Sequence, residues 1–125
     1  MAKTPEGKVK DQIKLLFLKY GAYYTMPVKM GYGNNGELDF NAGLNAFRLD
    51  VEAKAGSNTP SELQWVHVER LAAAGCPSMV IKEDNLHVLQ KWLMLASVDG
   101  MPAAKLRVRP IRKPKGRGVL KHHRF

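Results

Sequence analysis

The segment RLDVEAKAGSNTPSELQ, residues 48–64, constrains the fold more than any other part of the chain. Apolar and charged residues alternate in it, and a Gly/Ser/Asn/Pro loop follows at once. The alternating residues are apolar Leu49, Val51 and Ala53 and charged Asp50, Glu52 and Lys54. Alternation is typical of a strand, in which residues i and i+2 share a face. The segment therefore predicts a strand that carries two carboxylates and an amine side by side.

Caps, turns and hydrophobic periodicity divide the rest of the chain into further helices and strands. The expected elements are a helix from Thr4 to about Gly21, strands over 22–28, 37–43 and 47–55, a helix over 59–74, a strand over 76–81 and a helix over 83–96. Three strands would form a meander, and a helical crossover would bring the fourth strand into parallel pairing. The order αβββαβα predicts an α/β fold with a mixed central sheet flanked by helices.

Three local details follow from the same patterns. Leu38 and Phe40 are expected on one face of the second strand, with Asp39 on the other. Thr59 and Glu62 have the spacing of a capping box, which predicts the start of the second helix. The glycines of GYGNNGE, residues 31–37, spell GxGxxG, but a strand rather than a helix is expected after them. A hairpin loop is therefore expected there instead of a dinucleotide site.

The net charge of +9 is concentrated at one end of the chain. The last 21 residues hold nine of the 20 basic residues and none of the 11 acidic ones. The nine are Lys105, Arg107, Arg109, Arg112, Lys113, Lys115, Arg117, Lys121 and Arg124. We expect a domain over 1–100 and a basic tail over 101–125 that contacts a polyanion, nucleic acid before an anionic membrane. The alternative is a tail that only aids solubility.

Other function classes have little support in the sequence. No apolar run has the length of a membrane span, and the N-terminus lacks the apolar core of a secretory signal. Cys76 is the single cysteine, so an internal disulfide is impossible, and the scattered histidines lack zinc-site spacing. His67, His87, His122 and His123 are expected at the surface or in the tail, and the two tryptophans in the core. A cytoplasmic protein is expected.

The polar face of the predicted sheet has the residue types that metal-assisted phosphodiester hydrolysis requires. Asp39 and the Asp50/Glu52/Lys54 row lie on neighbouring strands and can share a face. Clustered carboxylates repel one another, and a divalent cation such as Mg²⁺ or Mn²⁺ relieves that repulsion. The cation can also neutralise charge that develops on a phosphate, and Lys54 can orient a water molecule. The alternative is an exposed strand face with an ordinary Glu–Lys pair.

Four motifs in order carry a resemblance to a known family: TPEGKVK, GAYYTMPVKMGYGNNGELDF, EAKAG and TPSELQ. From about Thr4 to Leu95 the chain resembles a phage-type, stand-alone VRR-NUC nuclease of the PD-(D/E)xK superfamily, which is related in fold to Holliday-junction resolvases. The resemblance implies a restriction-endonuclease-like core. The chain departs from the family pattern at Leu38, where Pro is usual, and at Asp50, where an apolar residue is usual.

The resemblance also implies roles for individual residues. Glu6 would be the acid of the first helix, Asp39 and Glu52 the metal ligands, and Lys54 the catalytic lysine. The backbone carbonyl of Ala53 would be a further metal ligand. Gln64 would position the water, the lysine or a DNA phosphate.

Each assignment has a simpler alternative. Glu6 can merely stabilise the helix dipole, Asp39 can be a solvated acid, and Gln64 can be a plain surface residue. For Asp50, solvation is the preferred interpretation, and an addition to the metal site is the other.

The function expected from these observations is that of a Mg²⁺- or Mn²⁺-dependent endodeoxyribonuclease. Its substrate would be structured or branched duplex DNA, such as a Holliday junction. It would act as a homodimer with two active sites, in a bacterial or phage-infected cell. A non-catalytic nucleic-acid-binding protein with the same fold and basic arm is the alternative. A ribosomal or RNA-packaging protein would explain the tail, but it would leave the acids and Lys54 without a purpose.

Overall fold

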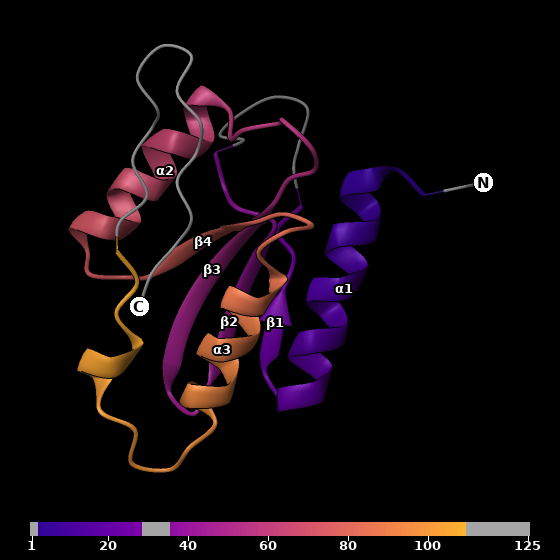
Figure 1. The fold of residues 1–125 in the computed structure, drawn as a ribbon. Helices are drawn as coiled ribbons and strands as arrows, with labels where there is room; N and C mark the ends of the chain where they lie inside the picture. Colours follow the sequence, from indigo (N-terminus) through magenta and orange to yellow (C-terminus); the bar gives the residue numbers. More distant parts are fainter. Residues whose placement is uncertain (1–2, 29–35, 110–125) are drawn as a thin grey trace.

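The computed structural model describes residues 3–28 and 36–109, and it has the predicted order αβββαβα (Figure 1). The elements are α1 (Pro5–Tyr20), β1 (Tyr23–Thr25), β2 (Phe40–Leu44), β3 (Phe47–Ala53), α2 (Glu62–Ala73), β4 (Ser78–Ile81), α3 (Leu86–Ala96) and the 3₁₀ helix η1 (Ala103–Leu106). Several predicted features lie outside the described residues. These are residues 31–35 of the GxGxxG loop, the six basic arm residues from Arg112 to Arg124, and His122 and His123.

The sheet is mixed and its strands run in sequence order, β1-β2-β3-β4. β1 and β2 pair antiparallel, with Tyr23 opposite Gly43, and β2 and β3 also pair antiparallel, with Phe40 opposite Val51. β3 and β4 are parallel, with Asp50 opposite Ser78. α2 connects these two strands, as a parallel crossover requires.

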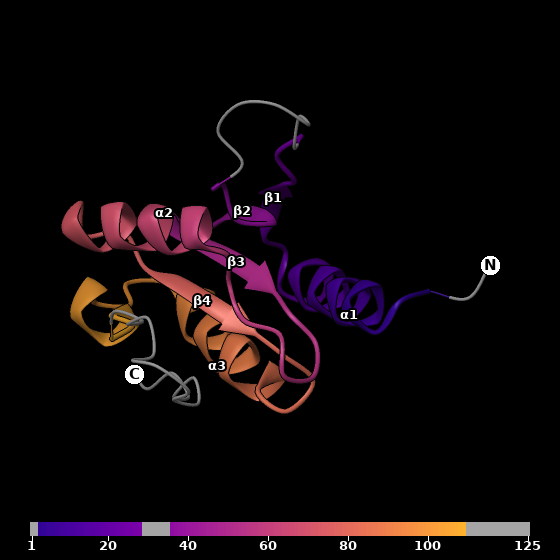
Figure 2. The same ribbon diagram turned by 90° about the horizontal axis from the view of Figure 1, so that it is seen from above.

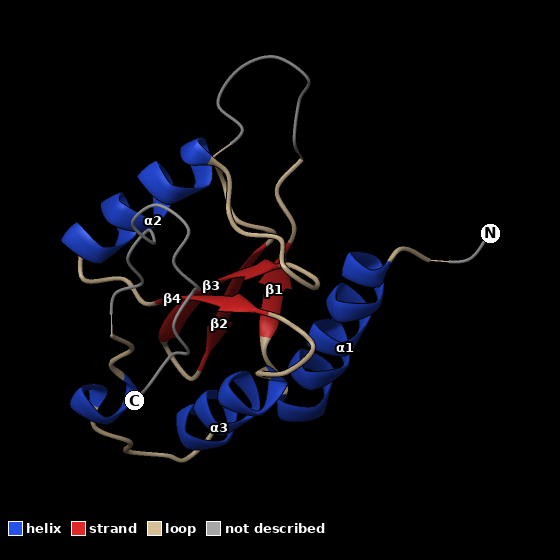
Figure 3. Ribbon diagram, turned by 45° about the horizontal axis from the view of Figure 1, so that its top comes forward, coloured by secondary structure: helices blue, strands red, loops and turns tan. Residues whose placement is uncertain are grey.

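Helices cover both faces of the sheet (Figures 2 and 3). α1 and α3 lie against one face, whereas α2 lies against the other. In β3, apolar Leu49, Val51 and Ala53 point toward α1 and α3 and form part of the larger core cluster. The alternate charged residues of β3 therefore lie on the α2 side, where the core is smaller and is built around Leu38, Trp65 and Val80.

α1 is held at both ends by caps and along its length by aromatic packing. The Thr4 hydroxyl accepts a hydrogen bond from the Gly7 amide, and Gly21 ends the helix in the left-handed conformation. The Phe17 ring packs against the rings of Tyr24 and Phe40, with centroids 5.1 and 5.6 Å away. These contacts join the C-terminal end of α1 to β1 and β2.

Two local predictions are wrong. Leu38 and Phe40 belong to cores on opposite sides of the sheet, because β2 begins only at Phe40 and the chain bends at Asp39. The cap of α2 is Ser61 rather than Thr59. The Ser61 hydroxyl accepts a hydrogen bond from the Gln64 amide, and the Gln64 side chain accepts one from the Ser61 amide. Ser61 has the same spacing to Gln64 as Thr59 has to Glu62, so spacing alone could not distinguish the two caps.

The first residues of the predicted tail pack on the folded domain. Leu106 is buried in the larger core, and its carbonyl accepts a hydrogen bond from the Trp92 indole at 3.1 Å. Met101 and Val108 also pack against that core. The folded unit therefore extends past residue 100. Among residues 3–28 and 36–109, no helix combines the length and apolar character that crossing a bilayer requires.

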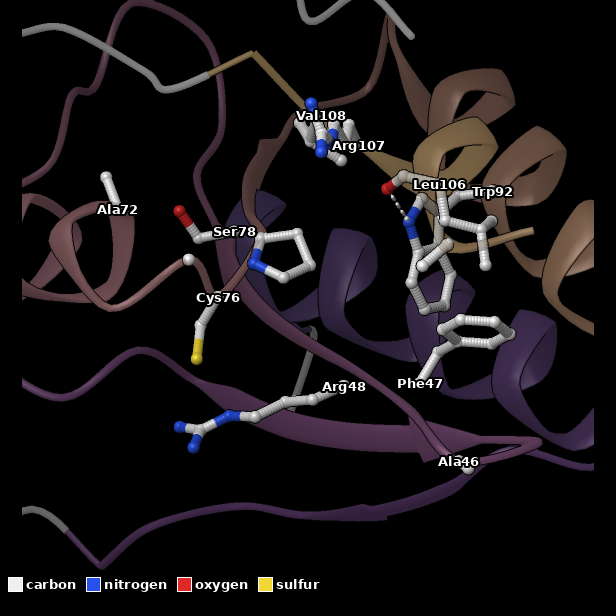
Figure 4. Close-up of a pocket in the computed structure, with 13 residues that line it drawn as sticks. Ala46, Phe47, Arg48, Ala72, Cys76, Ser78, Trp92, Leu106, Arg107 and Val108 are labelled. Carbon is white, nitrogen blue, oxygen red and sulfur yellow. Dashed lines mark hydrogen bonds between the residues drawn. The ribbon is translucent and has the colours of Figure 1, made fainter.

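A pocket of about 570 Å³ opens where η1 meets the beginnings of β3 and β4 (Figure 4). Its lining includes Phe47, Arg48, Cys76, Trp92 and Leu106. None of the residues to which the sequence assigned catalysis lines it. The pocket therefore lies at the end of β3 opposite to Glu52 and Lys54.

Candidate active site

Glu52 is the centre of a buried polar cluster at the C-terminal end of β3. Its residue exposure is 1%, and three groups from separate segments contact its carboxylate. The Asp39 amide donates to Oε1 at 3.0 Å, Gln64 Nε2 donates to Oε2 at 2.6 Å, and Lys54 Nζ lies 3.1 Å from Oε2. A carboxylate buried to this degree requires such partners, since desolvation of a charge is costly. Glu52 is therefore neither solvated nor in a simple exposed pair with Lys54.

Asp39 lies beside Glu52 because the two residues are joined through backbone amides in both directions. The Asp39 amide donates to Glu52, and Asp39 Oδ2 accepts a hydrogen bond of 2.9 Å from the Ala53 amide. Its side chain is 4% exposed, so the interpretation of Asp39 as a solvated strand acid is wrong. The bend before β2 and the last residue of β3 thus bring the two acids together.

Gln64 belongs to the site and to the N-terminus of α2 at once. Its backbone amide and its side-chain oxygen complete the Ser61 capping box, while Nε2 donates to Glu52. The residue is 5% exposed, so the plain-surface interpretation is wrong. Gly36 packs against the same helix end. A Cβ built on Gly36 would lie 2.5 Å from the Leu63 carbonyl oxygen, so only glycine permits this approach.

α1 contributes a third carboxylate, that of Glu6, and a cation, that of Lys10. Sequence reasoning missed Lys10. Lys10 Nζ lies 3.5 Å from Asp39 Oδ1 and 3.6 Å from Glu6 Oε2. Glu6 is therefore linked to Asp39 through Lys10, although it also lies in the first turn of α1, where an acid stabilises the helix dipole. The only sequence signal for Lys10 was its i+4 spacing from Glu6.

Electrostatics at the site combine three carboxylates with two ammonium groups, on Lys10 and Lys54. Full ionisation gives this set a formal charge of −1. The N-termini of α1 and α2 lie toward the end of the sheet at which β3 finishes, and they add positive potential there (Figure 1). The negative formal charge of the set favours a further cation, whereas the helix N-termini favour an anion.

The loop after Lys54 is tied to the turn between β4 and α3. The Gly56 amide donates to Glu83 Oε1 at 3.1 Å, and Lys82 Nζ donates to the Gly56 carbonyl at 3.0 Å. Backbone hydrogen bonds from Glu83 itself and from Gly56 lower the pKa of the Glu83 carboxyl. This clip limits how far the segment that begins with Lys54 can move.

Asp50 is not solvated, which corrects the preferred interpretation of this residue. It is 0% exposed and accepts two hydrogen bonds from Arg48, with Nε–Oδ1 at 2.9 Å and Nη2–Oδ2 at 3.1 Å. Hydrogen bonding to Asp50 raises the pKa of the Arg48 guanidinium. From Leu49 to Ala53 both faces of β3 are buried, so charged residues in an alternating pattern did not indicate exposure.

The donor set agrees with the preferences of Mg²⁺ or Mn²⁺. These are hard cations that take oxygen ligands, and Mg²⁺ typically accepts one or two carboxylates together with water and substrate phosphate. Asp39 and Glu52 offer two adjacent carboxylates, and the Ala53 carbonyl follows directly. In the part of the chain that the structure describes, no group of three or more Asp, Glu, His or Cys side chains is arranged to hold a metal. A metal here would therefore share its shell with water and substrate.

The remaining predicted residues have simpler environments. Trp65 and Trp92 are buried, as expected for packing residues, whereas His87 is exposed and His67 is half-buried. Of the basic arm, the described members are Lys105, Arg107 and Arg109, and all three are exposed. They are available to solvent and to a polyanion.

Comparisons with known proteins support the fold. No protein-family model matches the chain, and no curated protein sequence matches it. A solved structure described as a "VRR_NUC domain" is similar, with 23% identity and a TM-score of 0.55 over 74% of this chain and 92% of that one. The resemblance inferred from sequence is therefore confirmed at the level of the fold, which is restriction-endonuclease-like.

Proposed function

From the VRR_NUC fold and the buried polar cluster around Glu52, we propose that the chain is a divalent-metal-dependent endodeoxyribonuclease. Its substrate is structured or branched duplex DNA, such as a four-way junction. The convergence of Asp39, Glu52 and Lys54 is the observation that carries this proposal. These residue types are the ones that phosphodiester hydrolysis requires, and backbone amides orient both acids.

The residues divide the chemistry among them. Asp39, Glu52 and the Ala53 carbonyl would hold Mg²⁺ or Mn²⁺, which would neutralise phosphate charge and acidify a water molecule. Lys54, with its side chain 16% exposed, orients the attacking water and stabilises the charge that develops on the phosphate. Gln64 fixes the Glu52 carboxylate and through it the position of Lys54. Glu6 lies at the more open side of the site, where it contacts Lys10.

DNA binding rests on the basic arm and on shape. Lys105, Arg107, Arg109 and the arm residues after them contact phosphates, which gives salt-dependent affinity without sequence preference. Removal of the arm after Arg109 is therefore expected to weaken binding and to flatten its salt dependence. An arm that makes no phosphate contact would leave both the affinity and the salt slope unchanged. This truncation keeps Leu106 and Val108, so the folded core stays intact.

A homodimer is part of the proposal, because two sites are needed to cut both strands of a branched duplex in one encounter. Light scattering after size exclusion measures the mass of the particle directly. A mass of twice the chain's 14.0 kDa supports the dimer. A particle that contains one protein chain, whether or not junction DNA is bound, contradicts it.

One observation favours the competing function, a non-catalytic nucleic-acid-binding protein. Protein cations already contact both acids, since Lys10 lies beside Asp39 and Lys54 beside Glu52. Such a cluster can stabilise the fold without a metal. Under this alternative, DNA binding depends on the arm and the cluster is structural.

A cleavage assay separates the two functions. The protein and its Lys54→Ala variant are incubated with a four-way junction and with linear duplex, in Mg²⁺, in Mn²⁺ and in EDTA. Cleavage that requires the metal and is lost in Lys54→Ala supports the enzyme. Binding without cleavage under every condition supports the non-catalytic alternative. Lys8→Ala, a substitution of an exposed lysine on α1, controls for the loss of a lysine.

A further inference from the structure

We propose that Lys10 competes with the divalent cation for Asp39, so that the protein binds the metal weakly until DNA arrives. This inference rests on the proposed function and adds a regulatory residue to it. Two separate distances carry it, those from Lys10 Nζ to Asp39 Oδ1 and to Glu6 Oε2. Lys10 is a positioning residue here, because it acts through the metal ligand.

The two lysines of the site hold their acids differently. Lys54 Nζ lies 3.1 Å from Glu52 Oε2, within hydrogen-bond distance, and the Lys54 side chain is 16% exposed. Lys10 Nζ lies at 3.5 and 3.6 Å from its two acids, and its side chain is 29% exposed. These distances describe an ion pair rather than a short hydrogen bond. Lys10 is therefore the lysine that a competing charge displaces at the lower cost.

The geometry of Asp39 places that competition on one oxygen. Asp39 Oδ2 accepts the Ala53 amide at 2.9 Å, whereas Oδ1 faces Lys10. A divalent cation at Asp39 must lie close to an ammonium group, and the two positive charges repel in a poorly hydrated site. Binding of the metal therefore requires Lys10 to move away from Asp39.

DNA gives the displaced lysine a new partner. Lys10 lies on the open side of the site with half-buried Glu6, and its stem can carry the ammonium outward into solvent. A phosphate that reaches the metal would also be in reach of Lys10 and would take the place of Asp39 as its counter-ion. Metal and DNA thus bind with positive coupling, because each removes a cost that the other would otherwise meet.

The first test measures metal affinity without DNA. Mn²⁺ is titrated calorimetrically into the wild-type chain and into Lys10→Gln, Lys10→Arg and Lys8→Gln. The account predicts that Lys10→Gln binds Mn²⁺ about tenfold more tightly, a typical size for coupling between sites. Lys10→Arg should bind as the wild type does, because it keeps the charge. Lys8 is exposed on the same helix, so Lys8→Gln is the matched control and should change nothing.

The second test measures the coupling itself. DNA affinity is determined by fluorescence anisotropy with and without Mn²⁺, with Lys54→Ala as the uncleaving background. Adding Lys10→Gln should reduce the Mn²⁺-dependent gain in DNA affinity and should lower the salt slope by about one phosphate contact. A purely structural Lys10 would lower the thermal midpoint in both states and leave this gain unchanged.

The possible failures are distinguishable. If Lys10→Gln binds Mn²⁺ no more tightly than the wild type while Asp39→Asn abolishes binding and cleavage, the competition is refuted and the nuclease survives. If Mn²⁺ binding is absent from the wild type in the presence and absence of DNA, the proposed function fails and this inference fails with it.

Discussion

The two ends of β3 carry the same local pattern, an acid and a base two residues apart on the α2 side of the sheet, yet only one end forms a candidate active site. At the start of the strand, Arg48 grips Asp50 with two hydrogen bonds, and one partner accounts for both carboxylate oxygens. At the other end, Glu52 is shared among Lys54, Gln64 and the Asp39 amide, which come from three segments. Asp50 is thus held by its neighbour on the same strand, whereas Glu52 joins three segments of the chain.

What differs is the part of the fold that meets each end. The N-termini of α1 and α2 and the bend before β2 converge on Glu52 and bring a second acid, an amide and a second lysine. The Arg48 end meets the last turn of α2, the loop after it and η1, which line a largely apolar pocket (Figure 4). A strand pattern therefore supplies charges, and the surrounding elements decide whether those charges form a structural pair or a site.

The largest expected effect is on the rate of cleavage, and it distinguishes Glu52 from Asp50. Glu52→Gln should lower the rate of metal-dependent cleavage by about 10²- to 10³-fold, because it removes a charged ligand of the metal that neutralises charge in the transition state. Asp50→Asn should leave the rate of the folded protein unchanged. Single-turnover cleavage of a junction measures both. Equal losses in the two variants would erase the distinction between the ends of β3.

The next effect concerns stability, for which the Arg48–Asp50 end of β3 should matter more than the Glu52 end. Arg48→Ala leaves the buried Asp50 carboxylate without its bidentate partner, so it should lower the free energy of unfolding by about 3 kcal/mol. Combined replacement by Arg48→Met and Asp50→Leu should recover most of that loss, because no buried charge remains. Urea denaturation gives both values. A single substitution that costs nothing would show that the pair is not a structural lock.

The smallest effect lies in the clip behind Lys54. The pKa of Glu83 is lowered, so its carboxylate contributes stability above its ordinary pKa of 4.5, and this contribution is lost as the pH falls through the lowered value. Glu83→Gln should therefore lower the thermal midpoint slightly at neutral pH and make no difference in strong acid. Thermal melts across this pH range provide the measurement. A constant difference at every pH would assign the effect to shape rather than charge.

Sequence patterns predicted the order of the elements because caps, turns and periodicity are local. They also predicted that Asp39, Glu52 and Lys54 would share a face, whereas the inclusion of Gln64 and the roles of all four residues came from the family resemblance. The prediction that Leu38 and Phe40 share a face failed, since the strand begins later than its alternating pattern suggests. Start positions depend on pairing with a neighbour, which a single segment does not encode.

The environments of two residues, Lys10 and Asp50, could not be predicted from the sequence for a physical reason. Lys10 reaches Asp39 because α1 docks against the sheet through Val9, Ile13 and Phe17, and that docking is a tertiary property. Asp50 looked solvated because charged residues on a strand usually face water. α2 covers that face, and Arg48 compensates the buried charge. The Lys10–Asp39 contact and the cover that α2 gives to Asp50 both depend on how separate elements pack.

The most direct measurement for the central claim is anomalous diffraction from crystals of the protein with Mn²⁺ and uncleaved DNA. We predict an anomalous peak between the Asp39 and Glu52 carboxylates, next to the Ala53 carbonyl, with Lys10 turned away from Asp39. If no peak lies there and Lys10 and Lys54 keep their ion pairs while DNA is bound, the cluster is structural and the nuclease proposal is contradicted.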